Sequence, residues 1–419
     1  MPDKETKKIL LVGPYPPPYG GIASIITNML DPLVNNGYSV YILSFNEREE
    51  VIQPKKNVTI IRLNLKKQIK MFYQFKYWGL TIRSLIAGLQ QGLSLKETVK
   101  SVVSLIVTSR IIKENDIRLI AAYHTESVYY FKQIKKTFKN LAIYLTVFAE
   151  LYTSNNLSQR KKRFIRESLS ICDKVLATSY YCAGAVEQVG FNPKNVQVIY
   201  AGIDIKKYSP TVDGGNIRLA INIPNNKKLI LFVGRFIREM GLDMVLVVIP
   251  ILLRKRDDVV FMLIGAHGEL DLPAREVQGK YPDKVFIYND VNYSELPGYY
   301  AAADFLVAPS QDKRACMGLA IKEAMAMGKP TIGSATGGIP EAIVAGETGL
   351  LVPVDNDLKI NKQKFIEAIE CLLNNPELAE AMGKKARERA ERLFSDEVTY
   401  RIITNTFNDL LAKYPGEGL

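Results

Sequence analysis

Short apolar runs rich in β-branched residues alternate with longer helical patterns along almost the whole chain. Runs that are apolar on both faces and alternate with helices indicate parallel sheets covered by helices. The runs form two successive series, so the 419-residue chain is predicted to fold into two doubly wound α/β domains. The runs lie at residues 9–12, 38–43, 58–63, 117–122, 141–147 and 174–177, and then at residues 228–233, 259–264, 284–287, 305–308, 330–332 and 349–352.

The first series gives way to the second at residues 208–216, where Pro, Gly, Asp and Ser accumulate. This composition is typical of a connection between domains. We therefore expect one Rossmann-like domain over residues 1–208 and another over residues 209–394. The last segment, residues 395–419, is predicted to be helical after an N-cap at Ser395 and to pack back on the N-terminal domain.

The composition argues against several classes of protein. The four cysteines form no CxxC pair, and only two histidines are present, so a disulfide framework and a zinc site are both disfavoured and a reducing compartment fits better. No uncharged apolar stretch reaches the ~20 residues that a membrane span needs. The first eight residues, MPDKETKK, lead directly into a predicted strand, so we expect no signal peptide.

The positive charge is concentrated in the N-terminal half. Residues 1–200 contain 28 Lys and Arg against 14 Asp and Glu, whereas the remainder contains 27 against 29. Residues 66–83 mix cations with aromatic side chains, and residues 132–139 and 160–166 add further cations. Such a field suits an anionic membrane surface, although a solvated helix face gives the same pattern. Nucleic-acid binding uses similar residues, but nothing in the predicted fold supports it.

Ligands of open α/β sheets bind beside the carboxyl ends of the strands, so the loops there are the candidate sites. In the N-terminal domain, Gly20 and Gly21 open the first helix, where free N–H groups attract a phosphate or a sugar. His124 follows the fourth run and is placed to bind a hydroxyl or to transfer a proton. The alternatives are a turn that only closes the fold and a surface histidine without a role.

In the C-terminal domain, Arg235 and Arg238 follow the first strand, where a guanidinium can grip a diphosphate in bidentate fashion. A solvated run of charges is the alternative. Glu323 lies in the longest of these loop regions, and a carboxylate there can accept both hydroxyls of a ribose. Gly337 and Gly338 precede a helix and can cradle a phosphate through their amides.

An ordered set of short motifs resembles the retaining GT-B glycosyltransferases of glycosyltransferase family 4. Each motif is weak alone, but their order along nearly the whole chain is specific. The motifs are the Gly-rich first loop, Ser179, Tyr200-Ala-Gly202-Ile-Asp204, Tyr208-Ser-Pro210, Gly234-Arg235, Tyr293-Ser-Glu-Leu-Pro297, Tyr299-Tyr300, Pro309-Ser310, Glu323-Ala-Met-Ala, Gly328-Lys-Pro330, Gly337-Gly338-Ile-Pro-Glu341 and Gly349-Leu-Leu.

The resemblance implies two Rossmann-like domains that face a central cleft, with a nucleotide-sugar on the C-terminal domain and an acceptor on the N-terminal domain. The donor would be a UDP- or GDP-sugar, and no metal or other cofactor is expected. Carried over by position, the catalytic residues would be His124 at the donor sugar, Arg235 at the diphosphate and Glu323 at the ribose. The remaining donor contacts would come from Gly20, Gly21, Arg238, Gly318, Leu319, Gly337 and Gly338.

The sequence departs from the family pattern at two positions. Family members usually have a Glu eight residues before Glu323, where this chain has Ala315, and a Lys at the position of Met240. Both groups would normally face the donor sugar and its diphosphate. Asp312, Lys313, Arg314 and Arg238 are near enough in sequence to compensate.

We therefore expect a cytoplasmic enzyme, peripheral at the inner face of the membrane, that transfers a sugar to a lipid-linked or saccharide acceptor in cell-surface polysaccharide or glycolipid synthesis. Two alternatives stay open. One is a catalytically degenerate relative that serves as a binding or scaffold partner, and the other is a nucleotide-sugar epimerase of the same fold.

Overall fold

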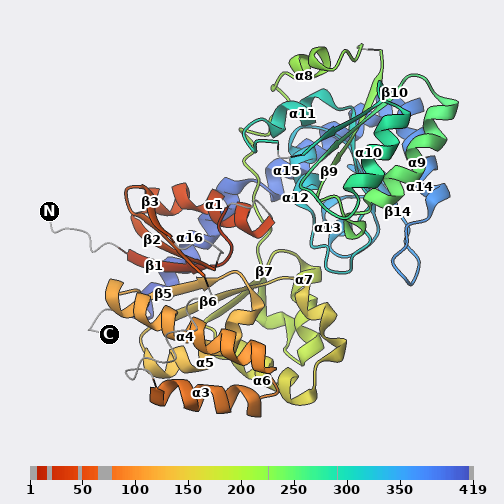
Figure 1. Ribbon diagram of the computed structural model, residues 1–419. Coiled ribbons are helices and arrows are strands. Elements are labelled where there is room, and N and C mark those ends of the chain that lie inside the picture. The colour runs from red at the N-terminus through yellow and green to blue at the C-terminus, as the bar shows by residue number, and fades with distance from the viewer. Residues whose placement is uncertain are drawn as a thin grey trace. The chain divides into compact units, whose positions relative to one another are not determined.

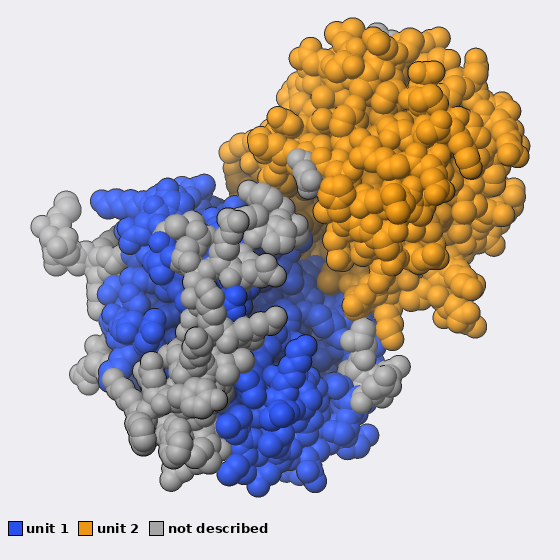
Figure 2. Space-filling model, in the orientation of Figure 1, with its two compact units in different colours: residues 1–199, 399–419 blue, residues 200–398 orange. Residues whose placement is uncertain are grey.

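The computed structural model describes residues 7–16, 21–45, 50–64, 78–224, 226–289 and 291–414 of the chain. The chain forms two compact units (Figures 1 and 2). The first comprises residues 1–199 and 399–419, and the second comprises residues 200–398. Two parallel α/β sheets, one in each unit, confirm the predicted fold class.

The sheet of the first unit has eight strands in the order β3-β4-β2-β1-β5-β6-β7-β8. Neighbouring strands run parallel, except that β3 pairs antiparallel with β4 at the edge. The strands are β1 (Lys7–Val12), β2 (Tyr38–Phe45), β3 (Glu50–Lys55), β4 (Val58–Leu63), β5 (Leu119–Ala122), β6 (Ala142–Val147), β7 (Lys174–Ala177) and β8 (Val196–Val198).

The sheet of the second unit has six strands, all parallel, in the order β11-β10-β9-β12-β13-β14. This is the strand order of the doubly wound nucleotide-binding fold. The strands are β9 (Lys228–Val233), β10 (Val259–Ile264), β11 (Val285–Tyr288), β12 (Phe305–Ala308), β13 (Thr331–Ser334) and β14 (Gly349–Val352).

Helices connect the strands and cover both faces of each sheet (Figure 1). In the described part of the first unit they are α1 (Gly21–Asn35), α3 (Trp78–Gln90), α4 (Leu95–Asn115), α5 (Val128–Thr137), α6 (Gln159–Leu169), α7 (Tyr180–Gly184) and α16 (Asp396–Ala412). In the second unit they are α8 (Gly215–Ala220), α9 (Leu242–Lys255), α10 (Asp271–Lys280), α11 (Leu296–Ala302), α12 (Leu319–Ala326), α13 (Ile339–Ala342), α14 (Lys362–Asn374) and α15 (Pro376–Leu393). None of the helices in these described residues is long and apolar enough to cross a membrane.

The strands are apolar throughout because both of their faces are buried. Along β9, Ile230 and Phe232 contribute to a core with α9 and α14, while Leu229 and Leu231 contribute to a second core with α11 and α12. All six residues of β10 are buried. The alternation of side chains across a strand therefore supplies two hydrophobic cores from one uninterrupted apolar run.

The two units divide after Ile199, whereas the sequence places the boundary after Tyr208. Tyr208 is fully buried in the second unit, where its ring packs against those of Tyr293 and Tyr300. The Pro- and Gly-rich segment that follows is therefore an internal connection of the second unit.

The chain returns to the first unit through α16. The buried ring of Phe407 packs edge-to-face on Tyr38 and Tyr144, at centroid distances of 6.3 and 5.0 Å. The Tyr38 hydroxyl donates to Asn408 Oδ1 at 2.8 Å. Aromatic packing of this kind adds stabilisation to the area that it buries.

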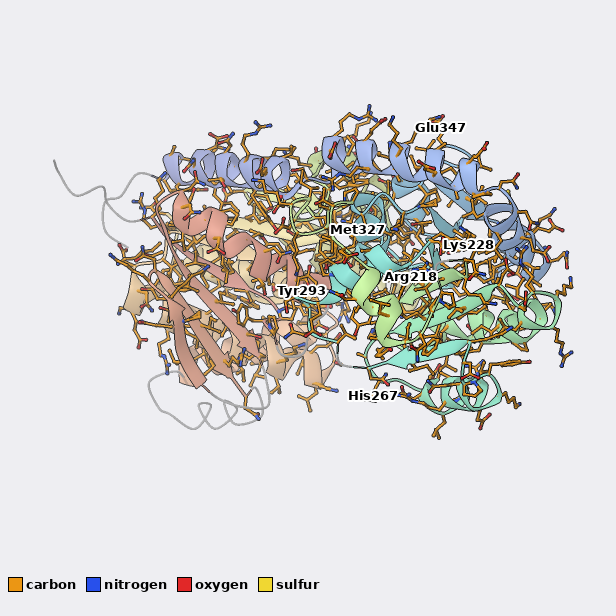
Figure 3. The ribbon with its side chains drawn as sticks, turned by 90° about the horizontal axis from the view of Figure 1, so that it is seen from above. Arg218, Lys228, His267, Tyr293, Met327 and Glu347 are labelled. Carbon is orange, nitrogen blue, oxygen red and sulfur yellow. The ribbon has the colours of Figure 1, made fainter. Side chains whose placement is uncertain are left out.

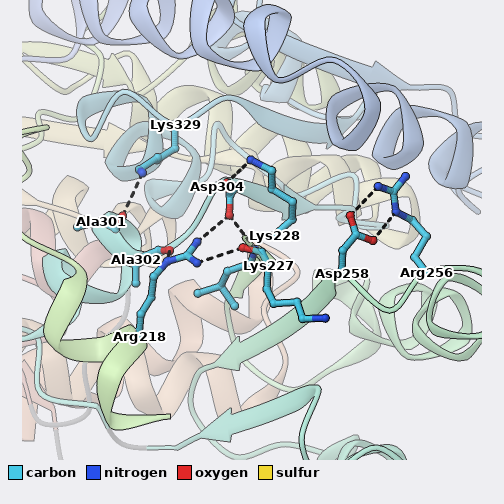
Figure 4. A network of polar contacts seen from close by, with 10 residues as sticks. Arg218, Lys227, Lys228, Arg256, Asp258, Ala301, Ala302, Asp304 and Lys329 are labelled. Carbon is cyan, nitrogen blue, oxygen red and sulfur yellow. Dashed lines mark hydrogen bonds and ion pairs between the residues drawn. The ribbon is translucent and has the colours of Figure 1, made fainter. Parts of the chain in front are cut away.

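A polar network ties the amino ends of β9 and β12 together (Figure 4). The Asp304 carboxylate accepts from Arg218 at 2.8 Å, from Lys228 at 3.1 Å and from the N–H of Leu229 at 2.8 Å. Arg218 also donates to the carbonyl oxygen of Ala302 at 2.8 Å. The network lies at the amino edge of the sheet, opposite the carboxyl edge where ligands of such sheets bind.

Candidate functional site

In each sheet the strand order reverses at one point, and this point predicts where a ligand binds. In the first sheet, the strands that follow β1 in the chain lie on one side of it, and those that follow β5 lie on the other side, so the order reverses between β1 and β5. In the second sheet the order reverses in the same way between β9 and β12. A crevice opens where neighbouring connections diverge to opposite faces of the sheet. The loops that follow these four strands are therefore the candidate sites, one in each unit.

In the first unit, the loops after β1 and β5 lie side by side. The N–H of Tyr123 donates to the carbonyl oxygen of Val12 at 2.9 Å, which continues the pairing of the two strands. A Cβ atom at Gly13 would lie 2.7 Å from Cδ1 of Ile26 and 3.3 Å from Cβ of Tyr123, so a larger residue would require these side chains to shift. The loop after β1 leads to Gly21, the first residue of α1.

His124 follows β5 at this same edge with its ring orientation fixed. Its Nδ1 accepts a hydrogen bond from the N–H of Glu126 at 3.1 Å, which caps the short helical turn at Thr125–Ser127. An Nδ1 that accepts leaves the proton of the neutral imidazole on Nε2. The half-buried ring can therefore donate from Nε2 to a ligand oxygen.

Two features that the sequence singled out in the first unit lie outside the described residues. Gly20 is one of them, so the structure places only Gly21 of the predicted glycine pair. The other is most of the cationic and aromatic segment, because description resumes at Trp78, where α3 begins.

In the second unit, the loop after β9 carries both predicted arginines. Arg235 and Arg238 are exposed, and Arg238 pairs with Glu269 at 3.6 Å. Met240, where the family has a cation, packs against the hydrophobic core beside α9. Arg235 is therefore the arginine of this loop that forms no ion pair among the described residues.

The loop after β12 is bound closely to the loop after β9. The hydroxyl of Ser310 and the N–H of Gln311 both donate to the carbonyl oxygen of Glu239, at 2.9 and 3.0 Å. Gly241 has a φ of +77°, and a Cβ there would lie 1.8 Å from the carbonyl oxygen of Pro309. These contacts hold the two loops in one arrangement at the point where the strand order reverses.

Helix α12 begins in the same place. Gly318 precedes it with a φ of 72°, and Leu319 is its first residue. Gly318 is exposed and Leu319 is half-buried, so the first turn of the helix is open to solvent. The N–H groups of a first helical turn have no partners within the helix and favour a negatively charged ligand.

Gly337 and Gly338 connect the loop after β13 to the loop after β12. A Cβ at Gly337, which has a φ of +59°, would lie 2.1 Å from the carbonyl oxygen of Ala315. The N–H of Gly338 donates to that same oxygen at 2.8 Å. The Gly338 amide thus has a protein partner, and this glycine pair fixes the position of Ala315.

Glu323 lies within α12, and its carboxylate is surrounded by tyrosines. The side chain belongs to a residue that is only 4% exposed. The hydroxyl of Tyr300 donates to Oε2 at 2.7 Å, and the hydroxyl of Tyr293 donates to Oε1 at 3.5 Å. Burial raises the pKa of this carboxyl above its usual value, while the hydroxyls of Tyr300 and Tyr208 and the charge of Lys207 act in the opposite direction.

Sequence reasoning assigned no role to the residues that surround Glu323. Tyr293 (labelled in Figure 3) lies between β11 and α11, and Tyr300 lies in α11. Lys207 donates to the carbonyl oxygen of Tyr293 at 2.9 Å and lies 3.6 Å from the centroid of its ring. The available signal was the density of tyrosines at 208, 293 and 299–300, but only the fold brings these separate segments together.

The acid and base nearest to Ala315 in sequence bind each other. Asp312 accepts from Arg314, with Nη2 and Oδ2 separated by 2.7 Å. The bond to Asp312 raises the pKa of the arginine above its already high ordinary value. Asp312 lies three residues, and Arg314 one residue, before position 315, where the family has a glutamate. The carboxylate nearest to that position in the loop is therefore paired with a cation.

Two family models match the chain and together span most of it. The model described as glycosyltransferase family 4 matches residues 19–207, and the model described as glycosyl transferases group 1 matches residues 215–389.

Curated relatives match over part of their length. Spore coat protein SA of Bacillus subtilis (strain 168) is 27% identical over 274 residues, which cover 62% of this chain and 71% of that protein. D-inositol 3-phosphate glycosyltransferase of Corynebacterium glutamicum (strain R) is 29% identical over 238 residues, which cover 54% of each chain. This chain therefore spans only about half of the length of the second relative.

Solved structures match over nearly the whole chain. Sucrose-phosphate synthase from Thermosynechococcus elongatus superposes with a TM-score of 0.76 at 20% identity, covering 97% of this chain and 100% of that one. Anabaena Alr3699/HepE in complex with UDP and glucose superposes with a TM-score of 0.70 at 17% identity, covering 96% and 100%. At these identities the likeness establishes the fold.

Proposed function

Since the chain belongs to glycosyltransferase family 4, whose members retain the anomeric configuration, we propose that it transfers a sugar from a nucleotide-sugar to an acceptor hydroxyl. In this reaction the bond between the anomeric carbon and the diphosphate oxygen breaks. A bond from that carbon to the acceptor oxygen forms on the same face of the sugar, and the acceptor hydroxyl loses its proton. Negative charge therefore develops on the departing diphosphate.

One observation supports this proposal above the others. Arg235 follows β9, and the open first turn of α12 and Glu323 follow β12, so two separate segments meet at the carboxyl edge where the order of the second sheet reverses. A guanidinium and free amides suit a diphosphate, and a carboxylate suits a ribose. Arg238, Gly337 and Gly338 complete the proposed donor site as neighbours that shape its loops.

In the proposed reaction, Arg235 stabilises the negative charge that develops on the departing diphosphate. Removing one preorganised donor from a developing anion typically costs about 100-fold to 1,000-fold in kcat. We expect Arg235→Ala to lose transfer by about this factor, and Arg238→Ala, whose side chain pairs with Glu269, to lose much less. Initial rates of nucleotide release with and without acceptor measure both. An Arg235→Ala variant as active as the wild type would refute the assignment.

We assign the acceptor to the first unit. His124 can donate from Nε2 at the edge where the loops after β1 and β5 meet, and the loop after β1 leads to Gly21 at the start of α1. In the proposed reaction His124 orients the transferred sugar or the attacking hydroxyl. The donor is proposed to be a UDP-sugar, with GDP as the alternative, because the solved relative HepE was crystallised with UDP and glucose.

We further propose that the first unit rests on an anionic membrane surface, as expected for a lipid-linked acceptor. The α3–α6 surface comprises Ile86, Leu89, Leu95, Lys96, Arg160 and Arg163, all exposed, and Arg163 also pairs with Glu167 at 2.8 Å. Helix α6 lies against the α3–α4 turn, because a Cβ at Gly92 would lie 3.0 Å from the Ser158 hydroxyl oxygen. Leu95 is 66% exposed, which is costly in water and favourable at an interface.

Vesicle sedimentation tests this membrane surface. Vesicles with about one third anionic lipid should bind the wild type, and Arg160→Glu/Arg163→Glu should weaken binding about 10-fold or more, since each cation contributes about 1 kcal/mol. A matched charge reversal in the second unit, Lys384→Glu/Lys385→Glu, should have little effect. Equal binding of all three proteins would contradict the proposed surface.

A degenerate relative is the competing function, and the environment of Met240 favours it. A methionine packed on the core replaces the family cation, and Ala315 replaces the family glutamate. Such a protein would bind a nucleotide-sugar without transferring it. An epimerase would instead release a changed sugar without any acceptor, so the dependence of nucleotide release on an added acceptor separates the three functions.

A further inference from the structure

The two oxygens of the Glu323 carboxylate have different surroundings. Oε2 accepts a bond of 2.7 Å from Tyr300, whose side chain is fully buried. Oε1 lies 3.5 Å from the hydroxyl of Tyr293, at the limit of a hydrogen bond, and Tyr293 is only half-buried. Oε2 is thus held by a short hydrogen bond from the protein interior. Oε1 has a long, weak contact with Tyr293, which lies in the loop that follows β11.

The weak partner is itself held in place by its other contacts. The Lys207 ammonium lies 3.6 Å from the centroid of the Tyr293 ring and donates to the carbonyl oxygen of Tyr293 at 2.9 Å. Burial lowers the pKa of Lys207, and the negative charge of Glu323 opposes this shift. The position of the Tyr293 ring therefore does not depend on the long contact between its hydroxyl and Glu323. A ligand hydroxyl can replace that contact while the loop keeps its conformation.

We propose that Tyr300 is the positioning residue for Glu323. It fixes Oε2 so that Oε1 is presented to a ribose hydroxyl of the donor, which replaces the hydroxyl of Tyr293. The inference rests on the proposed function, because it names the group that prepares the donor site for a ribonucleotide. It does not make Tyr300 a catalytic residue, since its hydroxyl bonds to Glu323 and acts on the donor through that carboxylate.

Geometry supports an exchange at Oε1 over one at Oε2. A hydrogen bond to a carboxylate weakens as it lengthens beyond about 3.0 Å, so the Tyr293 contact at 3.5 Å is the easier to replace. A bound ribose hydroxyl restores a full bond at that oxygen. Since the carboxylate is almost completely buried, an oxygen left without a good partner is costly, and the site therefore favours a ligand that supplies one.

The test compares nucleotides that differ only in the ribose hydroxyls. UDP and GDP, and their 2′,3′-dideoxy forms, are titrated calorimetrically into the full-length wild type, Tyr300→Phe, Tyr293→Phe and the control Tyr299→Phe. Tyr299 is next to Tyr300 in the sequence, but its ring packs on Tyr288 instead. The quantity compared is the ratio of the dideoxy Kd to the ribonucleotide Kd, which a general loss of structure does not change.

For the nucleotide that binds, the wild type should prefer the ribose form by about 10-fold or more, as a hydrogen bond to a charged group allows. Tyr300→Phe should reduce this ratio to a few-fold, whereas Tyr299→Phe should preserve it. Tyr293→Phe should preserve or increase it, because a competitor for Oε1 is removed.

One result would overturn the inference while leaving the proposed function in place. It is an unchanged ratio in Tyr300→Phe, whether the two affinities stay the same or fall by the same factor. A ratio that collapses in Tyr293→Phe would reassign the role to Tyr293. If none of the four nucleotides binds the wild type at millimolar concentration, the proposed function fails and the inference fails with it.

Discussion

At the residue scale, a few side chains carry the proposed chemistry, and their environments differ from what the sequence suggests. Glu323 was predicted as a ribose ligand, and the structure shows that the residue is almost fully buried, with its carboxylate bonded by Tyr300 and Tyr293. Arg235 is exposed at the end of β9, as a ligand for a mobile diphosphate should be. Their assigned roles remain predictions. The sequence identified both positions, but not the partners that the fold supplies from α11 and residue 207.

The enclosure of Glu323 predicts an unusual dependence of stability on pH. Because burial raises the pKa of its carboxyl in the folded state above the unfolded value, the folded state favours the protonated form. Its stabilising contribution is complete below the unfolded pKa of about 4.3 and is lost as the pH rises through the folded value. Glu323→Gln, which is neutral at every pH, should therefore become more stable relative to the wild type as the pH rises from 4.5 to 7.

Urea denaturation at a series of pH values measures this difference. The control is Glu388→Gln, at an exposed position of α15 in the same unit, which should follow the wild type throughout. A Glu323→Gln variant that loses stability relative to the wild type with rising pH would contradict the sign of the predicted shift.

At the scale of elements, the strands were largely predictable, because a short uninterrupted apolar run in an α/β protein usually forms a parallel strand that is buried on both faces. The predicted runs at 174–177, 228–233, 305–308 and 349–352 coincide with β7, β9, β12 and β14. Neither β3 (Glu50–Lys55) nor β8 (Val196–Val198) was predicted. The first is an antiparallel edge strand in which Val51 is 65% exposed, and the second has only three residues, so neither shows an apolar run.

The loops between these elements were less predictable, because their positions depend on backbone contacts that side-chain patterns do not record. Gly337 illustrates this point. From the sequence, Gly337 was predicted to bind a phosphate through its amide. The structure shows in addition a φ of +59° and a close approach to Ala315, which join the loop after β13 to the loop after β12.

Substitution at Gly337 tests how much that approach contributes. Gly337→Ala must adopt an unfavourable backbone conformation and must also move a backbone carbonyl, because its Cβ would lie 2.1 Å from the Ala315 oxygen. We expect a loss of about 3 kcal/mol in the free energy of unfolding. Gly346 has a φ of +77° with no atom within 4 Å of an added Cβ, so Gly346→Ala should lose only about 1 kcal/mol.

Thermal and urea unfolding of the two variants give the comparison directly. Equal losses would show that backbone conformation alone accounts for the cost, and that the contact between the loops after β12 and β13 contributes nothing.

At the scale of the whole molecule, the fold class followed from the alternation of strands and helices, and the GT-B family followed from the order of its motifs. The sequence placed the division between the units near residue 208, but the aromatic packing of Tyr208 on Tyr293 and Tyr300 moves it to residue 199. The predicted cleft between the domains remains a prediction, as do the acceptor and the membrane surface.

The central claim is that this chain binds a nucleotide-sugar and transfers its sugar although Met240 and Ala315 replace two family groups. The most direct measurement is the rate of sugar transfer when the wild type is incubated, without added metal, with UDP-glucose or GDP-mannose and candidate acceptors. We predict acceptor-dependent transfer from one donor, with the anomeric configuration retained, and its loss in Arg235→Ala. Donor binding without any transfer to lipid-linked or saccharide acceptors would contradict the claim and would favour a binding protein that has kept the fold.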